Sequence, residues 1–148
     1  MDDTIVINFE LRRLEKGDIA VAYNIFFYDD ASVIESFYLH RLEDPDTQIP
    51  RGTLRRFRVP LSAAGGDVRS EELCGTAIEL PSLDYARMNT RAELRYVYGV
   101  GLRSERGFYD QLVKIDISTR SSTTWRAPDS YPGEGVFVRR PGARDEDD

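Results

Sequence analysis

The sequence contains a single cysteine, Cys74, and a single histidine, His40. One cysteine cannot form a disulfide within the chain, and it excludes a zinc site built from several cysteines. The apolar setting of Cys74 beside Leu73 favours a buried, unreactive thiol. A lone histidine without a second histidine, a cysteine or a nearby carboxylate pattern is more typical of a surface or cap residue than of a metal ligand. We therefore expect no metal at His40.

An excess of positive charge is also missing. The chain has 20 Lys and Arg against 26 Asp and Glu, which gives a net charge of −6. A nucleic-acid surface needs clustered basic side chains that are not neutralised by acids. The arginine pairs at 12–13, 55–56 and 139–140 are short and flanked by acids. The charge pattern therefore predicts no nucleic-acid partner.

Long hydrophobic runs are absent as well. No stretch approaches the roughly 20 apolar residues that a membrane-spanning helix needs. Residues 1–15 are interrupted by Asp2, Asp3, Glu10, Arg12 and Arg13, so no signal peptide is readable. We expect the cytoplasm, or an organelle reached after import, as the compartment.

What the sequence does contain is a period of two among its apolar residues, in short runs separated by Gly, Pro, Asp and Ser. This pattern predicts an all-β chain, and the length of 148 residues suits one domain or a piece of one. The expected strands cover residues 4–11, 18–28, 54–61, 75–80, 94–101, 111–116, 122–126 and 135–139.

One segment departs from this pattern. Ser32 and Glu35 have the spacing of a capping box, and apolar residues follow at helical spacing. This predicts one short amphipathic helix over residues 32–42, ending before Pro45. Gly99 and Gly101 do not continue into a phosphate-binding fingerprint, because no third glycine or helix start follows.

The C-terminal run Tyr131-Pro132-Gly133-Glu134-Gly135-Val136-Phe137-Val138-Arg139-Arg140-Pro141-Gly142-Ala143, followed by Asp145-Glu146-Asp147-Asp148, resembles a known motif. It is similar to the stretch "GEPxFVPRPGA-x-x-EDDG" near the C-terminus of carotenoid cleavage oxygenases, the lignostilbene dioxygenase and retinal pigment epithelium isomerase family. Further resemblance lies in residues 29–34 with Leu39 and Arg41-Leu42, in residues 54–61, in Ile78-Glu79-Leu80-Pro81, and in Arg95-Tyr96-Val97-Tyr98-Gly99 with residues 112–116.

This resemblance covers about residues 17–148 and implies a fold. The family fold is a seven-bladed β-propeller with a helical cap, of which residues 1–148 would form a partial domain of about three blades. It also implies an activity: the family uses Fe(II), held by four histidines, and dioxygen to cleave a double bond of a carotenoid, apocarotenoid or stilbene. Contact with a membrane surface is possible in the family.

The resemblance also assigns two site residues. In the family, glutamates hydrogen-bond three of the iron-binding histidines, which fixes the orientation of each imidazole. Two of these glutamates fall on Glu79 and Glu134 by motif. From the residues alone, Glu79 could equally be a surface acid at a strand edge, and Glu134 a solvated turn residue.

The departures from the family pattern concern the iron ligands. The run that carries the third histidine of the family should precede Gly17, where this chain has Phe9-Glu10-Leu11-Arg12-Arg13-Leu14-Glu15. None of the four histidines is present, and Gly135 replaces the usual proline. We therefore expect a fragment of a cleavage dioxygenase that is inactive alone, with no catalytic residue and no iron of its own.

Two alternatives remain open. The chain could be a non-catalytic β module that binds a protein partner through unpaired strand edges. It could also bind a lipid surface or an apolar ligand such as an apocarotenoid. Residues 19–28 combine high β-propensity with no charge and no proline, the profile of an aggregation-prone segment. We therefore expect self-association, or a requirement for a complementary fragment.

Overall fold

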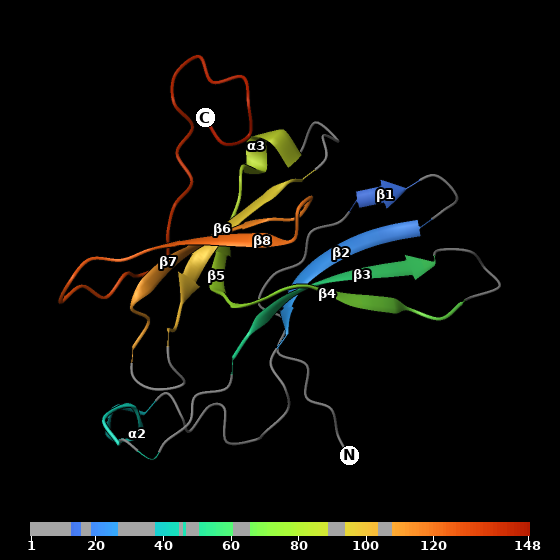
Figure 1. The fold of residues 1–148 in the computed structure, drawn as a ribbon. Coiled ribbons are helices and arrows are strands. Elements are labelled where there is room, and N and C mark those ends of the chain that lie inside the picture. The colour runs from blue at the N-terminus through green and yellow to red at the C-terminus, as the bar shows by residue number, and fades with distance from the viewer. Residues whose placement is uncertain are drawn as a thin grey trace.

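A computed structural model describes residues 13–15, 19–26, 38–44, 46, 51–60, 66–88, 94–103 and 108–148. Within these residues the chain forms two four-stranded antiparallel sheets, each built from strands that follow one another along the chain (Figure 1). The elements are β1 (Arg13–Glu15), β2 (Ile19–Phe26), α2 (Leu39–Leu42), β3 (Thr53–Pro60), β4 (Arg69–Ala77), β5 (Glu79–Ser82), α3 (Tyr85–Met88), β6 (Tyr96–Gly101), β7 (Gln111–Asp116) and β8 (Ser121–Trp125). The all-β prediction is confirmed.

The first sheet has the order β1-β2-β3-β4. Strands β2 and β3 pair without interruption from Ile19 opposite Pro60 to Phe26 opposite Thr53. Strand β4 pairs with β3 through a register irregularity on both sides of Leu54. Its Glu71 lies opposite Arg56 and carries an ion pair of 3.2 Å to that residue, so opposite charges on facing strands support the pairing.

The second sheet has the order β5-β6-β7-β8. In its centre, Val97 lies opposite Ile115 and Gly99 opposite Val113, so these residues share the buried face. A Cβ atom at Gly99 would lie 2.4 Å from the Glu79 carbonyl oxygen. Glycine is therefore needed at this position because the backbones of β5 and β6 approach too closely for a side chain. The two glycines of this run belong to a strand and not to a phosphate-binding loop.

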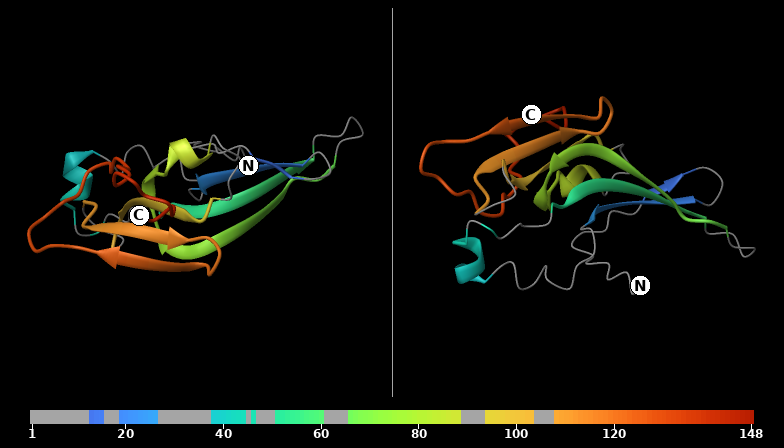
Figure 2. Two further views of the ribbon diagram at one scale, coloured as in Figure 1. Left: turned by 90° about the horizontal axis from the view of Figure 1, so that it is seen from above. Right: turned by 60° about the horizontal axis from the view of Figure 1, so that its bottom comes forward.

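The core lies where the two sheets meet (Figure 2). Leu54 and Leu73 of the first sheet pack with a cluster from the second half of the chain that includes Val97, Val113 and Ile115. Polar contacts also join the sheets, since Arg120 Nη2 lies 2.8 Å from Glu71 Oε2. Burial of this apolar cluster is the main force that holds the two sheets together.

Each sheet is an antiparallel meander, the arrangement of a propeller blade. The sequence predicts about three blades, and the described residues form two such sheets. The predicted strand at 75–80 is divided at Ile78, whose N–H donates to the Gly52 carbonyl at 2.9 Å, so β4 ends and β5 begins there. The predicted strand at 135–139 is wrong, because this segment joins no sheet. The predicted strand at 4–11 lies outside the described residues.

The helices differ from expectation in extent. Helix α2 begins only at Leu39, because Tyr38, inside the helix predicted over 32–42, has extended backbone with φ −67° and ψ 138°. Residues 32–37 of that prediction lie outside the described residues. Helix α3, a single turn that begins three residues after β5 ends, was not predicted. No helix in the described part of the chain has the length and apolar character required to cross a membrane.

Candidate functional site

Glu79 is the first residue of β5 and is buried, with 6% of its surface exposed. The backbone N–H of Gly52 donates a hydrogen bond to the Glu79 carboxyl. Burial raises the pKa of Glu79 to about 8, and the hydrogen bond from Gly52 opposes this only in part. The side chain therefore retains its proton at neutral pH, where an ordinary glutamate is ionised.

Tyr109 shares this environment. Its pKa is raised to about 12, first by burial and second by the nearby charge of Glu79. The Glu79 carboxyl and the Tyr109 phenol therefore lie close enough to influence each other electrostatically. Such a carboxyl can donate a hydrogen bond when protonated, and it can accept one when a donor stabilises its ionised form.

The backbone of β5 is irregular next to Glu79. Glu79 lies opposite Val100 and Ser82 opposite Tyr98, so three steps along β5 match two along β6. Leu80 takes up the extra residue with a φ of 47°, in the left-handed region that side chains rarely adopt. As a result both Glu79 and Ser82 are buried, while Leu80 is 39% exposed.

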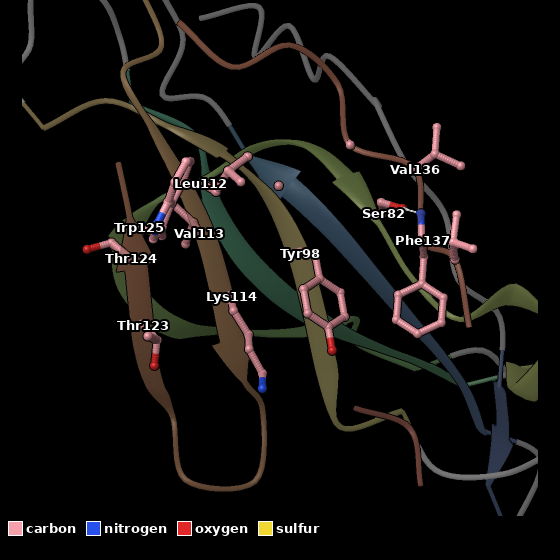
Figure 3. Close-up of a pocket in the computed structure, with 13 residues that line it drawn as sticks. Ser82, Tyr98, Leu112, Val113, Lys114, Thr123, Thr124, Trp125, Val136 and Phe137 are labelled. Carbon is pink, nitrogen blue, oxygen red and sulfur yellow. Dashed lines mark hydrogen bonds between the residues drawn. The ribbon is translucent and has the colours of Figure 1, made fainter. Parts of the chain in front are cut away.

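Glu134 lies in an exposed segment that we call the strap, residues 133–139. The strap is attached to the end of β5: the Phe137 N–H donates to Ser82 Oγ at 3.2 Å, as drawn in Figure 3, and Arg139 forms an ion pair with Asp84. Glu134 itself is exposed. It lies near Tyr85, whose pKa is raised by burial first and by the charge of Glu134 second.

The structure thus associates both predicted glutamates with β5, but at its two ends. Glu79 begins the strand, and Glu134 lies near Tyr85, three residues beyond Ser82. Their predicted role toward iron-binding imidazoles remains a prediction.

The C-terminal acidic run returns to the second sheet. Buried Glu146 accepts hydrogen bonds from the Arg95 N–H at 2.9 Å and the Tyr96 N–H at 2.8 Å. Asp147 accepts one from the Tyr98 hydroxyl at 2.6 Å and pairs with Lys114. The run is therefore a structural attachment that covers one face of β6 and β7.

A groove of about 400 Å³ remains between the strap and the same face of the sheet (Figure 3). Its walls are mainly apolar, and Val136 and Val138 are 84% and 81% exposed. The single tryptophan, Trp125 of edge strand β8, also lines it and is exposed. The groove lining is Ser82, Tyr98, Gly99, Leu112, Val113, Lys114, Thr123, Thr124, Trp125, Gly135, Val136, Phe137 and Val138.

An iron site formed by several imidazoles does not fit these residues. His40, the only histidine of the sequence, is exposed on α2 and stacks on Tyr38 with ring centroids 5.8 Å apart. Across the described residues, no group of three or more His, Cys, Asp or Glu side chains could hold a metal ion.

Several residues around the two glutamates and the strap were not predicted from the sequence. Ser82, Asp84 and Tyr109 were not singled out, although Ser82 and Asp84 lie within three residues after the Glu-Leu-Pro run that was. The signal that could have found Asp84 is an isolated acid between two apolar residues, Leu83 and Tyr85. Its partner, 55 residues away, is not visible in the sequence pattern.

Comparison with known proteins finds similarity both in sequence and in fold. Residues 9–148 match the family model of the retinal pigment epithelial membrane protein. The chain is 30% identical to human beta,beta-carotene 15,15'-dioxygenase over 99% of its length, and 32% identical to the torulene dioxygenase of Fusarium fujikuroi over 96%. The crystal structure of cobalt-substituted ACO from Synechocystis matches 97% of the chain with a TM-score of 0.75 at 23% identity.

These matches cover only part of the relatives. The chain spans 31% of the human dioxygenase, 29% of the torulene dioxygenase and 29% of the Synechocystis ACO chain. The prediction of a β-propeller fold, present here as a portion of the ring, is confirmed.

Proposed function

Since this chain belongs to the retinal pigment epithelial membrane protein family, in which its relatives are carotenoid dioxygenases, we propose that it forms part of an enzyme that cleaves a double bond of a carotenoid or apocarotenoid with dioxygen. The observation that carries this proposal is the family match over residues 9–148. On this view residues 1–148 are one portion of a propeller domain. A stilbene is the third substrate class that the family resemblance allows.

Within such an enzyme, Glu79 and Glu134 orient imidazole ligands that other parts of the enzyme supply. Iron(II) held by imidazoles with open positions binds and activates dioxygen. A carboxylate that accepts the second N–H of a ligating imidazole fixes its tautomer and direction. The burial of Glu79 supports this role, because an imidazole N–H is the type of donor that would stabilise its ionised form in a buried position.

The test is to measure metal binding and cleavage in this chain and in a full-length relative side by side. After anaerobic reconstitution, we expect the relative to retain about one iron per chain and to convert β-carotene or an apocarotenal to shorter aldehydes, detected by chromatography. This chain alone should retain no stoichiometric iron, because one imidazole cannot supply multidentate coordination. One tightly held iron per chain that is lost in His40→Ala would contradict the proposal.

A second candidate function is a non-catalytic β module, and the exposed apolar groove favours it. Val136, Val138 and Trp125 leave apolar surface uncovered beside the edge strand β8. If the chain is instead one portion of a larger propeller, we expect the isolated chain to self-associate or to require a complementary fragment. Size-exclusion chromatography with light scattering decides this point: a monodisperse 16.9 kDa monomer with a cooperative melt would contradict the expectation and favour the independent module.

A further inference from the structure

Asp84 is a buried carboxylate, 3% exposed, in the short turn between β5 and α3. Burying an acid is unfavourable unless an opposite charge and hydrogen bonds compensate for the lost water. Arg139 of the strap supplies an opposite charge and approaches Asp84 from 55 residues further along the chain. The contact between β5 and the strap is therefore a specific, partly desolvated ion pair.

A second contact joins Ser82 to Phe137, which precede Asp84 and Arg139 by two residues each. Ser82 Oγ, also buried, accepts the hydrogen bond from the Phe137 N–H, and the Phe137 ring lies 5.5 Å from the Tyr98 ring between centroids. Ser82 and Asp84 thus meet Phe137 and Arg139 at matching intervals. The strap is aligned beside the end of β5 in the manner of a strand, but side chains of β5 and its turn make the polar contacts in place of backbone groups.

Glu79 and Glu134 are each separated from the Ser82–Phe137 contact by the same number of residues in the sequence. Glu79 precedes Ser82 by three residues, and Glu134 precedes Phe137 by three residues. Glu134 stands between Gly133 and Gly135, around which no atom lies within 4 Å of an added Cβ. The space around both glycines is therefore open, and the polar contacts that fix the strap downstream of Glu134 are those of Phe137 and Arg139.

We propose that Ser82 and Asp84 are positioning residues that anchor the strap and thereby set the location of Glu134 relative to Glu79. This inference rests on the proposed function for its effect on catalysis, whereas the anchoring itself does not. A carboxylate that orients a metal ligand must be held within about 0.5 Å of its working position by the groups around it. The Asp84–Arg139 pair provides that restraint from outside the glycine-rich turn.

The anchoring is tested by hydrogen–deuterium exchange resolved at the Phe137 amide. In this chain we expect Asp84→Asn and Arg139→Gln each to accelerate this exchange at least about tenfold, because the released strap loses the bond to Ser82. Arg140→Gln is the matched control, since the neighbouring Arg140 pairs with exposed Asp148 and not with β5. Arg139→Lys should restore most of the protection. Unchanged exchange in both test variants would overturn the inference, and Arg139→Gln keeps it testable if Asp84→Asn fails to fold.

The effect on function is tested in the natural protein that carries this segment. We expect Arg139→Gln to reduce iron retention and kcat about 10-fold to 100-fold with little change in KM, and Arg139→Lys to recover both. Faster exchange at Phe137 with normal iron retention and kcat would overturn the positioning role. If the unmodified protein neither holds iron nor cleaves a polyene, the proposed function fails, while the exchange result still decides whether Asp84 anchors the strap.

Discussion

Glu79 and Glu134 are expected to do the same work, yet the structure holds them in opposite ways. Glu79 is part of a strand, is buried, and has a pKa of about 8. Glu134 is exposed in the strap and is flanked by glycines. The comparison shows that one carboxylate is placed by the sheet itself and the other by distant side-chain contacts. The contribution of Glu79 to stability should therefore depend on pH, whereas the location of Glu134 should depend on the contacts of Ser82 and Asp84 with the strap.

The largest expected effect concerns the protonation of Glu79 in this chain. As pH rises from 4.5 toward 8, the unfolded chain releases this proton before the folded chain does, so the folded state becomes less stable. Glu79→Gln removes this dependence. At pH 9 we expect the variant to exceed the wild-type free energy of unfolding by about 5 kcal/mol, with little difference at pH 4.

Urea denaturation at pH 4, 7 and 9 measures this difference. Glu134→Gln is the control. Because this side chain is exposed, the free energy of unfolding of the variant should equal that of the wild type at each pH. If the free energy of unfolding changed with pH in the same way for Glu79→Gln and the wild type, burial would not raise the pKa of Glu79.

The second effect tests whether the two carboxylates share a role. In a complete enzyme, Glu79→Gln and Glu134→Gln should each lower iron retention or turnover about 10-fold to 100-fold, since each change removes an ionised acceptor but no ligand. Metal analysis and product chromatography are the measurements. Normal iron content and activity in both variants would show that the motif places the two roles on the wrong residues.

The third prediction extends the comparison to Glu146, a buried acid that, unlike Glu79, accepts two backbone N–H groups. Glu146→Ala should lower the free energy of unfolding by about 2 kcal/mol, because both amides lose their acceptor. Thermal and urea denaturation report this loss. Asp145→Ala, an exposed neighbour, should change stability by less than about 0.5 kcal/mol. An equal loss in both variants would contradict the attachment of the C-terminal run.

The smallest effect concerns Glu71, a partly exposed acid that joins the two sheets. It accepts contacts from Arg56, Arg58 and Arg120, and the bond from Arg120 contributes most to lowering its pKa. Its contribution is therefore present above the ordinary value of 4.5 and is lost as pH falls through the lowered value. Glu71→Gln should cost about 1 kcal/mol at pH 7 and less at high salt. A loss that is independent of salt would argue against an ionic contact.

The strands with visible alternation were predicted well. Strand β7 has the predicted bounds, 111–116, because Val113 and Ile115 face the core while Lys114 between them does not. Strand β4 was predicted only from residue 75, because residues 69–72 are charged or polar and Leu73 is the one large apolar residue that the strand buries. The alternation of apolar and polar residues that marks a strand is recognised only when several apolar residues recur at every second position.

Contacts between distant segments could not be predicted. Val136, Phe137 and Val138 suggested a strand at 135–139, but the segment pairs with side chains near the end of β5, and nothing in a single sequence shows which partner a segment will meet. Buried Asp84 and Glu146 were overlooked for the same reason. Acids are ordinarily expected at the surface, and the groups that allow their burial lie 50 or more residues away.

The left-handed conformation of Leu80 has a consequence for how such a chain can vary over generations. A glycine there would remove a strain of about 1 kcal/mol and should make the fold more stable. The same change would free the backbone beside Glu79 to adopt other directions. Selection for stability alone would therefore favour glycine at position 80, so that a leucine retained there in active descendants would mark selection for the direction of Glu79 at the expense of stability.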